Sequence, residues 1–167
     1  MPLRLTLYAV VLCAMGLAGV RIGDGYRQRE RLLAELVREL TRLEEQMLLR
    51  QQALGEALRQ KDMPLFSNLA DAVEADGAEA AWMEFCLRES APGGRLEAME
   101  PPERAAMDAF WAELGLLIRK QQQNRFDEAR EALTRLHAQA REEAAQRARL
   151  YGSLGVLLGL AAVVMLW

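Results

Sequence analysis

Two long runs without a charged side chain, one near each end of the chain, restrict its fold more than any other feature. The first extends from Leu5 to Val20 and the second from Leu150 to Trp167, and every charged residue except Arg4 lies between them. At about 1.5 Å rise per residue, helices of this length reach about 24 to 27 Å, slightly less than the roughly 30 Å hydrocarbon core of a bilayer. We therefore predict transmembrane helices over residues 3–22 and 150–167, with a domain over residues 24–149 between them.

The first run also fits a cleaved secretory signal, because Gly16 and Ala18 place small residues where a signal peptidase needs them. In that case the chain would be a secreted helical protein held by a C-terminal anchor. A lipid anchor at Cys13 is disfavoured by the bulky Leu12 that precedes it. The second run fits a buried core helix as well, but its place at the end of the sequence argues against that interpretation.

Basic residues beside the two runs predict the orientation. Lys and Arg close to a span are retained on the cytoplasmic side of a membrane. Arg4 alone precedes the first run, whereas the inner flanks carry Arg21, Arg27, Arg29 and Arg31 after the first run and Arg141, Arg147 and Arg149 before the second. The middle domain should therefore face the cytoplasm, as part of a two-span protein of the cell membrane.

The charge balance and the cysteines narrow the function classes. Of 21 Lys plus Arg, Arg4 and Arg21 precede the middle domain, which leaves 19 against 24 acids and a net charge of about −5 there. This excess of acid excludes a nucleic-acid surface and favours a basic partner. Cys13 and Cys86 lie in different media on this topology, so we expect no disulfide and a reducing compartment.

The middle domain is predicted to be all α, because helix formers dominate it and no alternating strand pattern is present. We expect an antiparallel helical bundle of about five to six helices between the two terminal transmembrane helices. Its core should consist of apolar residues that recur at spacings of three and four. These are Leu33, Leu36, Leu40, Leu43 and Met47; Leu65, Phe66, Leu69 and Val73; Ala78, Ala81, Trp82, Phe85 and Cys86; Met107, Phe110, Trp111, Leu114, Leu117 and Ile118; and Phe126, Ala129, Leu133, Leu136, Ala140, Ala144 and Ala148.

Helix boundaries are marked unevenly. No breaker ends the first long helix, whereas Asp62 followed by Pro64 predicts a helix start and Gly77 an interruption. The segment from Ser90 to Pro102 should be irregular, either a plain linker or a binding loop. Asn124 is the predicted cap of a last helix that begins near Phe126, and this helix, free of proline and glycine up to Tyr151, could continue into the second apolar run.

No residue pattern indicates catalysis, a cofactor or a metal site. His137, the single histidine, has no partner at a catalytic spacing, and Cys86 has no second cysteine or histidine near it in the sequence. Gly93 and Gly94 lack the Lys and the Ser or Thr of a phosphate-binding loop. We therefore expect a protein that is not an enzyme.

Gly155 and Gly159 form a GxxxG pair inside the second apolar run. Small residues at this spacing allow another membrane helix to approach closely. They are candidates for helix packing, either with other membrane subunits or in a homo-oligomer.

One set of positions, spread over nearly the whole length of the chain, forms a recognisable pattern: Leu43, Glu44, Leu54, Glu56, Ala57, Leu65, Phe66, Ala81, Trp82, Phe110, Leu114, Gly115, Gln122, Leu133, Ala138, Ala140, Arg141, Ser153, Leu154, Gly155 and Gly159. On these residues the sequence resembles the stage III sporulation protein AB family of endospore-forming bacteria. Two positions depart from the family pattern: Ile118 stands where an acidic residue is usual, and Ala53 replaces a turn proline before Leu54.

This resemblance implies a non-enzymatic membrane platform subunit of the channel or secretion complex between mother cell and forespore, which endospore formation requires. It implies a domain similar to those of type II secretion platform proteins, placed in the mother-cell cytoplasm at the membrane around the forespore. There it would dock the stage III sporulation protein AA type ATPase, beside membrane lipid and other membrane subunits. The alternatives are a two-span extracytoplasmic helical sensor, which the basic flanks disfavour, and another membrane scaffold protein.

Overall fold

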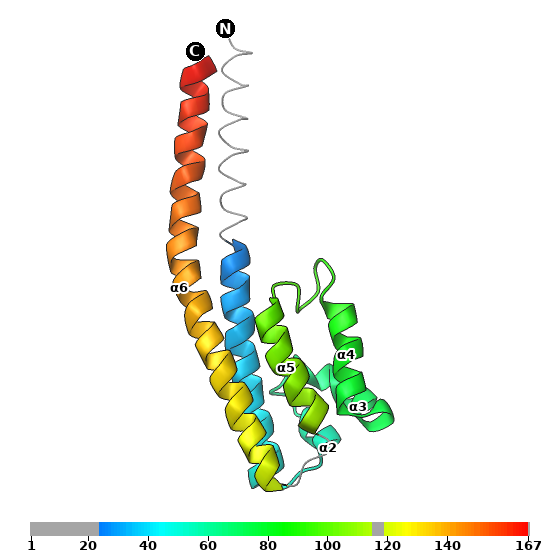
Figure 1. Ribbon diagram of the computed structural model, residues 1–167. Helices are drawn as coiled ribbons and strands as arrows, with labels where there is room; N and C mark the ends of the chain where they lie inside the picture. The colour runs from blue at the N-terminus through cyan, green and yellow to red at the C-terminus, as the bar shows by residue number, and fades with distance from the viewer. Residues whose placement is uncertain (1–23, 115–118, 167) are drawn as a thin grey trace. The chain divides into compact units, whose positions relative to one another are not determined.

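All regular elements in the described part of the chain, residues 24–114 and 119–166 of the computed structural model, are helical (Figure 1). An N-terminal helix covers residues 24–44. It is followed by η1, a turn of π-helix, and by the elements α2, η2 (a 3-10 turn), α3, α4, α5 and α6. Their bounds are Glu45–Leu49, Leu54–Leu58, Phe66–Leu69, Ala70–Asp76, Ala78–Glu89, Pro101–Leu114 and Arg119–Leu166, in that order. The predicted all-α class is confirmed for these residues.

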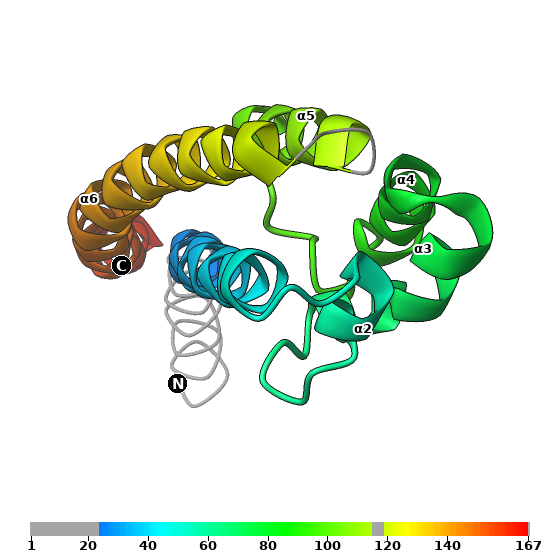
Figure 2. The same ribbon diagram turned by 90° about the horizontal axis from the view of Figure 1, so that it is seen from below.

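The described residues divide into two compact units. One, here called the paired-helix unit, consists of residues 24–30 and 139–166, and the other, the helical unit, is Arg31–Ala138. The helical unit contains α2 to α5 together with parts of the N-terminal helix and of α6. Within it, α4 and α5 run antiparallel on either side of the loop over residues 90–100, α3 lies against α4, and α2 lies against α3 (Figures 1 and 2).

The predicted apolar stripes form the core of the helical unit. Buried side chains from them are Leu33, Leu36, Leu40, Leu43, Ala78, Ala81, Trp82, Phe85, Cys86, Met107, Phe110, Trp111, Leu114, Phe126, Ala129 and Leu133. Met47 and Leu136 are half-buried instead. Met47 lies in η1, where the π turn changes the helical spacing that had placed it on the stripe.

Aromatic rings connect the elements of this core. Trp82 of α4 stacks on Trp111 of α5 with ring centroids 5.7 Å apart, and the edge of Phe66 in η2 meets Trp111 at 5.4 Å. Phe110 continues the series to Phe126 of α6 at 5.0 Å. Each such pair contributes about 0.5–1.5 kcal/mol beyond the area that it buries. The series therefore fixes α4 and α5 against their neighbours.

Two predicted helix starts are wrong. The chain turns irregularly after Asp62 and becomes helical only at Phe66, because the cap comes from a different helix, as described below. Asn124 lies inside α6, whose first described residue is Arg119, and residues 115–118 lie outside the described residues. The polar run after Arg119 continues the helix and does not cap it.

The irregular segment predicted from Ser90 to Pro102 is shorter than expected, because α5 begins at Pro101. The first helical positions have no intrahelical partner for their N–H groups, so a proline there loses no bond. The backbone N–H of Glu100 donates to Glu103 Oε2 at 2.6 Å, in the manner of a capping box. The predicted break at Gly77 is confirmed: with φ +87° it separates α3 from α4 in a conformation that a side chain would strain.

The continuous last helix is confirmed, since α6 runs unbroken for 48 residues to Leu166. The span predicted over residues 3–22 lies outside the described residues. Among the described helices, none combines the length and the apolar character required to cross a bilayer. Both membrane spans therefore stay predictions.

Candidate docking surface

A carboxylate from the N-terminal helix positions the start of η2 and α3. The buried side chain of Glu39 accepts hydrogen bonds from the backbone N–H groups of Leu65, at 2.9 Å, and Phe66, at 2.8 Å. These are first-turn groups that a helix leaves unpaired. Burial raises the pKa of Glu39 above its ordinary value, and the two backbone bonds offset part of that rise. Glu39 thus fixes α3 to the N-terminal helix, and through α3 it also fixes α4.

A second polar contact fixes α4 on α5. The indole N–H of Trp82 donates to Asp108 Oδ1 at 2.6 Å, and the Trp82 ring is almost fully buried. An unpaired buried indole N–H would cost free energy, so this bond sets the rotation of α4 as well as its position. The outer face of α4 is therefore presented in one fixed orientation.

That outer face carries an apolar stripe. Met83 is 52% exposed and Leu87 is 77% exposed, whereas most apolar residues of the helical unit are buried. Ala80, Met83 and Leu87 follow one another at spacings of three and four, so they share one side of α4. This side differs from the core face of Ala78, Ala81, Trp82, Phe85 and Cys86. Exposed apolar side chains that gather in this way mark contact surfaces.

A groove of about 380 Å³ opens beside the stripe. It lies between the start of α4 and the end of α5, and both Met83 and Trp111 line it. The remaining lining residues are Asp76, Gly77, Ala78, Glu79, Ala80 and Ala112. We call the groove together with Ala80, Met83 and Leu87 the α4 surface.

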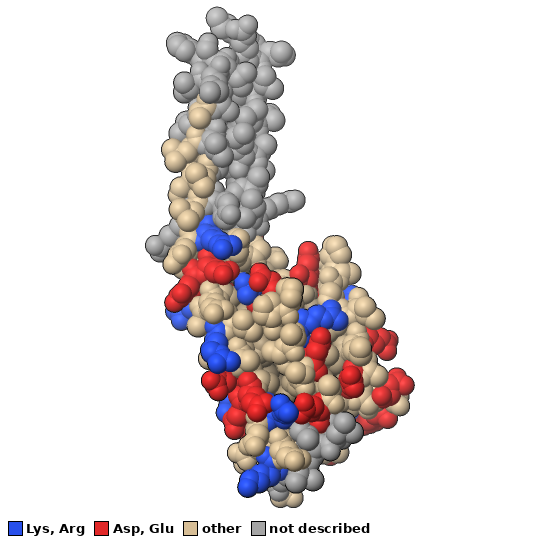
Figure 3. All heavy atoms as spheres, viewed as in Figure 1, with Lys and Arg blue, Asp and Glu red and all other residues tan. Residues whose placement is uncertain are grey.

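Acidic residues surround the α4 surface. From Ala70 to Leu87 the sequence contains Asp71, Glu74, Asp76, Glu79 and Glu84 but neither Lys nor Arg, and Arg88, the next residue, is paired with Glu89 at 3.3 Å. At about 100° per residue, Glu79 and Glu84 flank the apolar stripe on its two sides. Figure 3 shows acidic side chains gathered along the edge of the helical unit where Figure 1 places α3 and α4.

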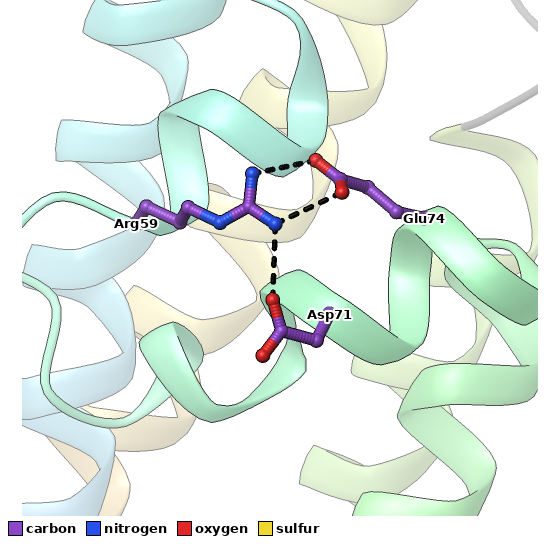
Figure 4. Close-up of polar contacts among 3 residues, drawn as sticks. All are labelled: Arg59, Asp71 and Glu74. Carbon is purple, nitrogen blue, oxygen red and sulfur yellow. Dashed lines mark hydrogen bonds and ion pairs between the residues drawn. The ribbon is translucent and has the colours of Figure 1, made fainter.

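Two of these acids are already paired. Arg59, the residue that follows α2, donates two hydrogen bonds to Glu74, of 2.7 and 2.9 Å, and a third to Asp71, of 3.0 Å (Figure 4). Gly55 lies against this cluster, because a Cβ there would come within 2.5 Å of Glu74 Oε1. Asp76, Glu79 and Glu84 have no ion-pair partner among the described residues. Their charges face outward uncompensated.

A second groove, of about 520 Å³, lies at η1. Thr41, Glu44, Glu45, Leu48, Leu49 and Gln123 line it, and Leu49 is 76% exposed. Its charges are largely compensated, because Glu44 pairs with Arg130 at 2.6 Å and Glu45 with Arg50 at 3.5 Å. This groove therefore offers a partner less electrostatic attraction than the α4 surface does.

The family-pattern residues have structural roles. Trp82 belongs to the aromatic core, and Leu114 is the buried last residue of α5. Gln122 of α6 donates from Nε2 to the Leu114 carbonyl at 3.3 Å, which satisfies one of the free carbonyls at the end of α5. Gly115 lies outside the described residues. Leu114 and Gln122 thus connect the end of α5 to the start of α6.

Two of the predicted topology residues pair the two helices of the paired-helix unit. Arg29 is buried and contacts Glu143 of α6 at 3.1 Å. Arg147 donates to the Tyr26 hydroxyl at 2.8 Å and lies over the Tyr26 ring at 5.2 Å. We call these four residues the clamp.

The remaining topology residues are exposed or not described. Arg27 is exposed and pairs with Asp24 at 3.5 Å, and Arg31 is exposed. Arg21 lies outside the described residues, as does the side chain of Arg149. The helical backbone of α6 includes Gly155 and Gly159, but their surroundings are likewise not described.

The metal and cysteine chemistry considered in the sequence analysis has no matching cluster of side chains in residues 24–114 and 119–166. No three His, Cys, Asp or Glu side chains in that part gather as metal ligands would. Cys86 is fully buried, and burial raises the pKa of its thiol to about 11. His137 is half-buried on α6. Of the two, the Cys86 thiol is shielded from solvent and largely protonated at neutral pH.

Sequence reasoning missed the α4 surface, although a signal for it was present. The stripe from Ala78 to Cys86 assigns the core face of α4, and the other positions of such a helix are normally polar. Met83 and Leu87 are apolar outside that stripe. The role of Glu39 had no such signal, because its partners lie 26 and 27 residues away in the sequence.

Comparison with known proteins gives one match. A family described as stage III sporulation protein AB has a model that matches residues 4–167. No curated protein and no solved structure matches the chain.

Proposed function

Because the chain belongs to the stage III sporulation protein AB family, whose model matches residues 4–167, we propose that it is a non-enzymatic platform subunit of the membrane complex between mother cell and forespore. A role in sporulation follows from the family. The platform role goes further: two spans hold the subunit in the mother-cell membrane around the forespore, and the helical unit docks a cytoplasmic ATPase of the stage III sporulation protein AA type.

The clamp is the observation that carries this proposal. Tyr26 precedes Arg29 in the N-terminal helix, whereas their partners Arg147 and Glu143 follow the opposite order in α6. The two helices are therefore antiparallel neighbours within the paired-helix unit. The first apolar run precedes one of them and the second continues the other. Such neighbours would enter a membrane side by side, which suits a subunit anchored by a hairpin of two spans.

An exposed recognition surface is the second requirement of a platform, and the α4 surface meets it. A subunit that joins a motor to a membrane must bind through its own side chains. The basic flanks favour a cytoplasmic location for these side chains, where the motor is. Membrane lipid and other membrane subunits are the expected partners of the two spans, for which Gly155 and Gly159 offer a close-packing face.

Co-purification tests the proposal. The tagged full-length chain, solubilised from membranes of sporulating cells, should retain the ATPase and the other membrane subunits. Arg29→Glu should weaken retention of the membrane subunits, because it places two acids face to face in the clamp. Combining it with Glu143→Arg should restore part of the loss, and Glu142→Arg, on the exposed neighbour of Glu143, is the matched control. Failure of the wild-type chain to retain the ATPase would reject the docking role.

A further inference from the structure

We propose that the α4 surface binds a basic amphipathic helix of the cytoplasmic partner. This inference rests on the proposed function, since it names the part of the helical unit that docks the motor. It also specifies the chemistry of the binding segment: apolar side chains along one side, with Lys and Arg on both flanks.

The apolar contact comes from the stripe and from the groove beside it. Met83 and Leu87 keep about half and three quarters of their surfaces in water, at 52% and 77%. Covering these side chains removes apolar surface from water, which favours association. The groove of about 380 Å³ has room for an apolar side chain from the partner. A helix that lays its apolar face along such a ridge and groove is a common mode of recognition.

The acidic residues beside the α4 surface favour a basic partner. Asp76, Glu79 and Glu84 border the contact and have no basic partner among the described residues. A segment rich in Lys and Arg would be attracted to this border, whereas an acidic segment or an anionic lipid surface would be repelled. A second copy that used the same surface in a two-fold pairing would bring the acids of both copies together. A basic segment of a different protein fits best.

The surface is also rigid before binding. Trp82 is bonded to Asp108 at 2.6 Å and stacked on Trp111, and Gly77 fixes the turn at which α4 begins. A partner therefore meets a preformed ridge and loses less free energy to the ordering of α4. Met83 supplies the adaptable contact within this frame, since methionine is flexible and polarisable.

The experiment measures binding of the purified ATPase to the full-length chain in nonionic detergent. Two double variants alter the α4 surface: Met83→Ser with Leu87→Ser removes the stripe, and Glu79→Lys with Glu84→Lys reverses the border. All four residues are exposed, so the fold should be retained. Matched controls are Leu49→Ser, which removes an exposed leucine at η1, and Glu56→Lys with Glu142→Lys, which makes the same change of charge elsewhere.

The wild-type chain should bind, and its affinity should fall as salt is added, because the border charges are screened. Each α4 variant should weaken binding by about tenfold or more, whereas both controls should stay within about twofold of wild type. If wild type binds and the α4 variants bind equally well, the surface assignment is overturned and the platform role is unaffected. A loss in Leu49→Ser and not in the α4 variants would move docking to the η1 groove and overturn it as well.

If the ATPase does not bind the wild-type chain, the number of heat-resistant spores tests whether the α4 surface has another partner. Cells that carry either α4 variant at normal protein level should then yield far fewer heat-resistant spores than cells with the controls. That result would keep the surface and assign it to another basic partner, while the motor-docking role fails. Normal spore counts would overturn the surface. Light scattering that finds a dimer for wild type and a monomer for Met83→Ser with Leu87→Ser would overturn the proposed partner in favour of a second copy.

Discussion

Substitution of Glu39 by Gln tests how the helical unit holds α3 and α4 in place. The carboxylate accepts two backbone N–H bonds, from Leu65 at 2.9 Å and Phe66 at 2.8 Å. A glutamine of the same shape keeps one acceptor oxygen but turns an NH₂ group toward the other backbone N–H. A buried N–H that loses its partner costs about 1–3 kcal/mol. The free energy of unfolding should therefore fall at neutral pH, by at most that amount, because glutamine also removes the cost of burying a charge.

The assay is urea unfolding of the full-length chain in nonionic detergent, followed by tryptophan fluorescence, because Trp82 and Trp111 are buried and stacked. The transition midpoint should move to lower urea with an unchanged slope. Glu56→Gln, at an exposed position of α2, is the matched control and should stay within about 0.5 kcal/mol of wild type. A Glu39→Gln chain as stable as this control would refute the capping role.

The pH dependence tests the electrostatics of the same residue. Burial raises the pKa of Glu39 above 4.5, so between 4.5 and the raised value the folded chain holds a proton that the unfolded chain has released. Stability from this residue is therefore greatest at lower pH and decreases as pH rises through that interval. The difference in free energy of unfolding between wild type and Glu39→Gln should therefore decrease as pH rises through that interval. An advantage that grows with pH would mean that the two backbone bonds outweigh desolvation.

Three further predictions concern single positions. Ala53 has φ −65°, the angle that proline imposes. Ala53→Pro should therefore raise the free energy of unfolding by about 0.4–1 kcal/mol in urea titrations. A destabilised variant would contradict this. Gly77→Ala should lower it by about 1–3 kcal/mol, because φ +87° with ψ 167° is a glycine conformation, and an unchanged midpoint would show that the α3–α4 turn relaxes. In a Cys13→Ser background, Cys86 should react with a maleimide at pH 8 only when the chain unfolds. A thiol with a pKa of about 11 is ionised to roughly one part in a thousand at that pH. Fast labelling of the folded chain would contradict the burial of Cys86.

The sequence predicts the elements of the fold better than the contacts between them. The stripes through Leu33, Trp82, Phe110 and Phe126 identified the core correctly, because the helical period is a local property and burial follows it. Helix ends were predicted less well. Caps are local only when the capping side chain is adjacent in sequence, and η2 takes its cap from Glu39 on another helix, so Asp62 was a misleading signal.

In the candidate site, too, the sequence identified residues better than the contacts between them. Arg29 and Arg147 were noticed as charges beside a membrane, but a count of charges does not reveal that Arg29 is buried against Glu143, more than a hundred residues later. The α4 surface depends on which side of α4 the core leaves uncovered. Met83 and Leu87 could have been identified as apolar residues outside the stripe, whereas the groove beside them required the position of Trp111 on α5.

The location of the helical unit relative to the membrane is the most direct test of the platform account. A single exposed cysteine, introduced as Ser90→Cys in the Cys13→Ser background, can be probed with a membrane-impermeant maleimide, because Cys86 is buried. In intact protoplasts of vegetative cells that express the chain, whose plasma membrane faces the reagent directly, the account predicts no labelling, and full labelling once the membrane is permeabilised. Labelling in intact protoplasts would place the domain outside the cytoplasm and contradict the account.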